Sequence, residues 1–131
     1  MQSYSNKPYM IERILSAGTY LTAGFVGLGW LVLATLLKKS VTPFLMYHIM
    51  QSFFISILFF LFTIFCQLIG YIPILNYIPY LINIPLPFIF NFSILQTFTT
   101  TIILYCTITS FMGYYSYIPW VSNIINRNCG R

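Results

Sequence analysis

The chain has 131 residues, of which 59% are hydrophobic and only 5% are charged. Soluble globular domains have about 25% charged residues, so this composition excludes an ordinary soluble domain and indicates an integral membrane protein. The net charge of +5 comes from six Lys and Arg residues near the ends of apolar runs. Membrane topology requires such an arrangement, so the charge does not indicate a nucleic-acid partner. We expect an all-α fold, a polytopic transmembrane helical bundle that forms one membrane domain over residues 1–131.

The first predicted span covers residues 16–37, a run of 22 residues without a charged side chain. As one helix it would be about 33 Å long, enough to cross a bilayer. A cleaved signal peptide would have a shorter apolar region and a cleavage site of small residues, so we interpret this run as a permanent span. Thr19, Ala23 and Gly27 recur every four residues. Such a face lets helices pack closely in lipid, and the alternative is a glycine-lined pore.

The second predicted span covers residues 44–70, after Thr42 and Pro43, which suit a helix start. Polar side chains share one face of it, because they are spaced by four or seven residues. We expect this face to point inward, either for hydrogen bonds between helices or as a narrow hydrated path. Its members are His48, Ser52, Ser56, Thr63 and Gln67.

Residues 71–87 contain four prolines, which no straight helix tolerates. We expect this segment to form turns in the membrane interface, and a re-entrant hairpin or a broken fourth span is the alternative. The third predicted span covers residues 88–113, with Gln96 and Thr100 on a polar face that could meet the face of the second span. An interfacial segment over residues 114–126, rich in aromatic residues, follows.

The sequence has few of the side chains that carry out catalysis or bind metals. It contains no aspartate, Glu12 is its one acid and His48 its one histidine. Paired carboxylates, a catalytic triad and a metal cluster of histidines and carboxylates therefore cannot be assembled within the chain. The three cysteines, Cys66, Cys106 and Cys129, are too widely spaced for a metal motif and are interpreted as small hydrophobic residues. We expect a protein that is not an enzyme and that binds no cofactor or metal.

Three short motifs resemble the Tic20-like family. They are the run from Arg13 to Leu21, the run from Phe44 to Gln51, and the run from Gly113 to Pro119. The family includes the small polytopic subunit of the chloroplast inner-envelope protein translocon and its bacterial relatives of unknown function. The resemblance implies a helical membrane protein with His48 and Gln51 at signature positions, and with the loop before them and the C-terminus on the cytosolic or stromal side. The chloroplast subunit has four spans and a transit peptide, neither of which is evident here, so the chain resembles the bacterial relatives.

With three spans, the distribution of cations predicts an orientation. Lys38, Lys39, Arg127 and Arg131 fall on one side, and Lys7 and Arg13 on the other. The positive-inside rule then places the C-terminus in the cytoplasm and the N-terminus outside, in a membrane of the bacterial inner-membrane type.

Two functions fit these observations. One is a scaffold or accessory subunit of a membrane complex, with the bilayer and other membrane proteins or a second copy as partners. The other is a channel-like or translocon-like protein with a polar path between helices. No small-molecule substrate is indicated. We further expect His48 and Gln51 to hydrogen-bond to the segment from Tyr114 to Pro119 or to the end of the third span, because buried polar side chains near the hydrocarbon boundary need partners.

Overall fold

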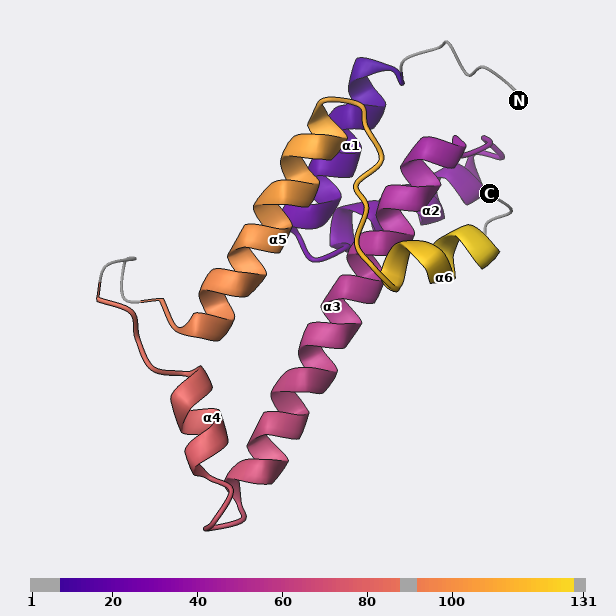
Figure 1. Cartoon of the computed structure of the whole chain (residues 1–131). Helices are drawn as coiled ribbons and strands as arrows, with labels where there is room; N and C mark the ends of the chain where they lie inside the picture. Colours follow the sequence, from indigo (N-terminus) through magenta and orange to yellow (C-terminus); the bar gives the residue numbers. More distant parts are fainter. Residues whose placement is uncertain (1–7, 88–91, 129–131) are drawn as a thin grey trace. The chain divides into compact units, whose positions relative to one another are not determined.

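The computed structural model describes residues 8–87 and 92–128 and confirms an all-α fold (Figure 1). Within these ranges there is no strand, only an isolated bridge between Pro85 and Ser93. The helices are α1 (Met10–Leu21), α2 (Phe25–Leu36), α3 (Pro43–Gly70), α4 (Tyr77–Ile82), α5 (Ile94–Phe111) and α6 (Val121–Asn128).

The prediction of one continuous span over residues 16–37 is wrong. The helix breaks after Leu21, because Ala23 and Gly24 adopt left-handed backbone conformations with φ of 54° and 95°. The chain resumes as α2, which turns back so that Gly27 packs against Thr19. Each of the two helices has 12 residues. A helix of that length is about 18 Å long, too short for a hydrocarbon core of about 30 Å.

Two of the described helices, α3 and α5, are long and apolar enough to cross a membrane. The 28 residues of α3 begin one residue before the predicted second span and end with it. The 18 residues of α5 begin later than the predicted third span, and residues 88–91 lie outside the described part. After α5, Gly113 takes a φ of 83°, and the N–H of Tyr114 bonds to the Thr109 carbonyl, which closes the helix end.

The chain divides into two compact units. The described part of the first unit comprises residues 8–56 and 105–128, which include α1, α2, the first half of α3, the end of α5, and α6. Its core includes a cluster of Tyr47, Val121 and Ile125, against which Ile118 and Met50 pack. The helix α6 buries Val121 and Ile125 and exposes its polar face, as an amphipathic segment should.

The second unit comprises residues 57–104. After α3 ends, the proline-rich segment forms tight turns over residues 71–76, then the six-residue helix α4. The absence of a long helix here follows from the prolines, as the sequence indicated. Most side chains of residues 57–87 and 92–104, the described part of this unit, are exposed or half-buried. The location of this segment in a membrane interface stays a prediction.

Candidate functional site

A buried polar cluster in the first unit joins three parts of the chain. It consists of Tyr20 from α1, His48 and Gln51 from α3, and Ser116 from the segment between α5 and α6. His48, Gln51 and Ser116 have no solvent exposure, and Tyr20 is also buried. Buried polar groups need hydrogen-bond partners, and each member of this cluster finds one in another member.

The hydroxyl of Tyr20 is the centre of the cluster. It lies 2.8 Å from Nδ1 of His48 and donates to Oε1 of Gln51 at 2.8 Å. Because the hydroxyl has one proton, donation to Gln51 requires the Nδ1–H of His48 to donate to the tyrosine oxygen. The hydroxyl of Ser116 also donates to Oε1 of Gln51, at 2.7 Å, and Nε2 of Gln51 donates to the Ser116 carbonyl at 3.2 Å. Gln51 therefore bonds both the side chain and the backbone of Ser116.

A second tyrosine extends the network to α6. The hydroxyl of Tyr47 lies 2.8 Å from the Ser116 carbonyl and 2.8 Å from Oγ of Ser122. Oγ of Ser122 accepts a hydrogen bond from the N–H of Ile118 at 2.9 Å. The segment between α5 and α6 is thus held at its backbone by side chains of both α3 and α6.

Aromatic rings enclose the histidine. The ring of Tyr115 stacks on His48 with centroids 6.0 Å apart, and Phe44 meets the histidine edge-on at 4.5 Å. Tyr20 and Tyr47 also approach it edge-on. Nε2 of His48 has no hydrogen bond of good geometry, although the Tyr114 backbone faces the ring. The arrangement fixes the ring within packed side chains, which suits a structural role better than contact with a substrate.

The predicted contact of Gln51 with the segment from Tyr114 to Pro119 is confirmed. His48 was also expected to hydrogen-bond to this segment. Its side-chain hydrogen bond instead joins it to Tyr20, and it contacts the segment by stacking on Tyr115. Ser52 is buried and bonds to the Ile49 carbonyl of its own helix. Ser56 donates to the Ala23 carbonyl at 3.1 Å and so joins α3 to the turn between α1 and α2.

The remaining polar residues of the predicted inward face are exposed. Thr63 donates to the Phe59 carbonyl of its own helix, and Gln67 is exposed. On α5, Gln96 is exposed and caps the N–H of Ser93 at 3.0 Å, and Thr100 is exposed. Among the described residues, no hydrogen bond joins the α3 pair to the α5 pair. The expected pairing of the two polar faces therefore stays a prediction.

The predicted small-residue face does not exist as one face, because the helix breaks within it. Ala23 lies in the turn, whereas Thr19 and Gly27 touch across it. A Cβ atom on Gly27 would lie 2.7 Å from Cγ2 of Thr19 and 2.8 Å from Cγ1 of Ile49. Small size at Gly27 therefore lets α1, α2 and α3 meet, which is helix packing and not a pore.

Sequence reasoning did not single out four members of the network, namely Tyr20, Tyr47, Ser116 and Ser122. The signal that could have found the two tyrosines is their position within otherwise apolar runs, because a buried tyrosine hydroxyl needs a partner. Tyr20, Tyr47 and Ser116 also lie inside the three motifs that carry the family resemblance.

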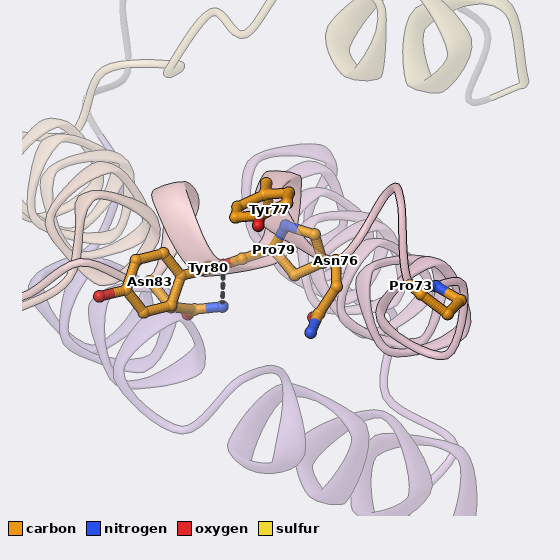
Figure 2. Close-up of a pocket in the computed structure, with 6 residues that line it drawn as sticks. All are labelled: Pro73, Asn76, Tyr77, Pro79, Tyr80 and Asn83. Carbon is orange, nitrogen blue, oxygen red and sulfur yellow. Dashed lines mark hydrogen bonds between the residues drawn. The ribbon is translucent and has the colours of Figure 1, made fainter.

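The second unit has an open depression of about 490 Å³ beside α4 (Figure 2). Nδ2 of Asn83 donates to the Pro79 carbonyl at 2.9 Å, so one of its polar side chains is used within the segment. Its lining includes no histidine, cysteine or carboxylate, the side chains that most often bind zinc in proteins. The lining residues are Pro73, Asn76, Tyr77, Pro79, Tyr80 and Asn83.

No protein-family model, curated protein or solved structure matches this chain.

Proposed function

We propose that this chain is a small integral membrane protein that serves as a scaffold or accessory subunit of a membrane complex. In this role α3 and α5 dock against helices of other membrane proteins or of a second copy. The observation that carries the proposal is the low burial of the two candidate spans. Only 11% of the most apolar 18-residue window of each is buried within the chain.

The exposed polar residues on these helices support docking. Gln67 on α3 and Gln96 and Thr100 on α5 are exposed, and a polar side chain in hydrocarbon gains from a hydrogen bond to a neighbouring helix. Each such bond contributes about 0.6 kcal/mol in membranes, so several weak contacts would act together. A polar path within the single chain has less support, because the buried cluster is closed by packed rings.

We also propose the Tic20-like relationship, in its bacterial form and without an enzymatic activity. Its support is spatial: the three resembling motifs are far apart in sequence, and each contributes to one buried cluster. Tyr20 comes from the first, His48 and Gln51 from the second, and Ser116 from the third. We propose a membrane of the bacterial inner-membrane type, with the C-terminus in the cytoplasm, as the cations near α6 favour.

Site-specific photocrosslinking in native membranes tests the scaffold proposal. A photoreactive residue is placed at Gln67 and, in a separate variant, at Thr100. The matched control is Leu58, nine residues before Gln67 and therefore about 180° around the helix. We expect protein adducts of defined mass from Gln67 and Thr100, and mainly lipid adducts from Leu58. Lipid adducts alone at all three positions would reject the proposal that these helices dock against protein.

A further inference from the structure

The backbone N–H groups of the turn between α1 and α2 all have hydrogen-bond partners within the chain. The N–H groups of residues 22–25 bond to carbonyls of Gly18, Tyr20, Thr19 and Thr22, at 2.8 to 3.4 Å. The N–H of Val26 bonds to the hydroxyl of Thr22 at 3.2 Å, and that hydroxyl donates to the Gly18 carbonyl. Irregular backbone is tolerated at membrane depth only when its polar groups are satisfied within the protein, and this turn meets that condition.

The carbonyl at the tip of the turn is also satisfied. Ala23, which has a positive φ, accepts a hydrogen bond from Oγ of Ser56 on α3 at 3.1 Å. Gly24 lies close to the α3 backbone, since a Cβ atom there would be 3.7 Å from Cα of Phe53. The tip is therefore tied to a helix that can itself cross a membrane.

The outer surfaces of α1 and α2 are apolar. Between Ile14 and Leu37 there is no charged residue, and large hydrophobic side chains point outward along both helices. Water is a poor environment for such a continuous surface, and acyl chains are a good one. The exposed side chains include Ile14, Leu21, Phe25, Val32, Leu33 and Leu36.

The charges of the hairpin lie only at its open end. Arg13 is in the first turn of α1, and Lys38 and Lys39 follow α2. Because α2 turns back on α1 (Figure 1), the short helices leave these cations at the two free ends of the hairpin. Such cations suit the phosphates of an anionic leaflet.

We propose that the α1–α2 hairpin enters one leaflet and returns to the same face, so that the chain crosses the membrane only twice, through α3 and α5. This inference rests on the proposed function, because it requires that α3 and α5 both span the membrane. Residues 40–126 contain no charged side chain. With two spans, all six cations of the sequence therefore lie on one face of the membrane, and the connection between α3 and α5 on the other face contains none. The three-span arrangement divides the cations four to two. The positive-inside rule places the face with six cations in the cytoplasm, and it places the start of α1 there as well.

Cysteine accessibility tests this topology in the full chain. The native Cys66, Cys106 and Cys129 are replaced by Ala, and single reporters are introduced as Tyr9→Cys, Ser40→Cys, Asn128→Cys and Ile74→Cys. A membrane-impermeant maleimide is applied to right-side-out and to inside-out vesicles. We expect the first three reporters to react only in inside-out vesicles and Ile74→Cys only in right-side-out vesicles. A fifth reporter, Ala23→Cys at the tip, should react in neither until the vesicles are dissolved in SDS.

Each other outcome overturns a defined part of the inference. Reaction of Tyr9→Cys and Ser40→Cys in opposite vesicles would show that this part of the chain crosses the membrane once. Reaction of Ala23→Cys in intact right-side-out vesicles would show that α1 and α2 both cross it. In either case the hairpin is not confined to one leaflet, and α3 and α5 could still span. Reaction of Ile74→Cys and Ser40→Cys in the same vesicles would show that α3 does not span, which would reject the proposed function along with the inference. Reaction of all three cation-side reporters only from outside would reverse the assigned face.

Discussion

Replacing Gly27 by Ala tests whether the contact of α1, α2 and α3 determines the fold. The added Cβ atom would lie 2.7 Å from Cγ2 of Thr19 and 2.8 Å from Cγ1 of Ile49. Carbon atoms in contact are ordinarily about 3.5–4.0 Å apart, so these neighbours must move by about 1 Å. Both are fully buried and β-branched, and such side chains have few alternative rotamers.

The size of the effect follows from two opposing terms. Overfilling a packed site costs about 1–3 kcal/mol, and replacing glycine by alanine within a helix gains about 1 kcal/mol. Gly29→Ala is the matched control, since it lies in the same helix and its added Cβ atom meets nothing within 4 Å. The helix-propensity gain cancels between the two variants, so their difference should be about 1–3 kcal/mol, with Gly27→Ala the less stable.

Unfolding by SDS titration in mixed micelles, followed by circular dichroism, measures the free energy of unfolding of each variant. We expect the midpoint for Gly27→Ala to fall below that of the parent protein, and the midpoint for Gly29→Ala to equal or exceed it. Equal midpoints for the two variants would refute the close three-helix contact and, with it, the hairpin geometry.

Other substitutions test the buried cluster and the helix ends. Tyr20→Phe removes the hydroxyl that bonds to His48 and Gln51, and it should lower the free energy of unfolding by about 1–2 kcal/mol in the same titration, whereas Tyr77→Phe at an exposed site should leave it unchanged. Gln51→Leu should speed limited proteolysis within residues 114–120, because Ser116 loses two hydrogen bonds; a rate no faster than that of Gln67→Leu would contradict this. Lys38→Gly should raise the free energy of unfolding by about 0.5–1 kcal/mol, because Lys38 has a φ of 51° that glycine adopts without strain; no gain over Lys39→Gly would count against that reasoning.

The parts of the fold that the sequence predicted are those set by local chemistry. The start of α3 follows from Pro43, and its length follows from an uninterrupted apolar run. The prolines of residues 71–87 prevented a long helix there, as expected. The contact of Gln51 with the C-terminal segment was predictable because a buried amide near a helix end has few available partners.

The break at Ala23 could not be read from the local sequence. Alanine favours a helix, and a glycine within an apolar run often continues one. The left-handed conformation of Ala23 is stabilised by contacts from Ser56, 33 residues later. Tyr20 was missed for a similar reason, since its partners His48 and Ser116 follow it by 28 and 96 residues. The spacing of residues within one helix gives no information about partners so far away in the sequence.

The hydrogen bonds between Gln51 and Ser116 also impose an order on biosynthesis, because these residues are 65 positions apart. At about 5–20 residues per second, the ribosome needs about 3–13 s to make the intervening chain. During that interval the Gln51 side chain lacks both of its hydrogen bonds to Ser116, although Tyr20, which also bonds to it, has already been made. A nascent chain that ends before Ser116 should therefore leave Nε2 of Gln51 without its folded-state acceptor until the last segment is synthesised.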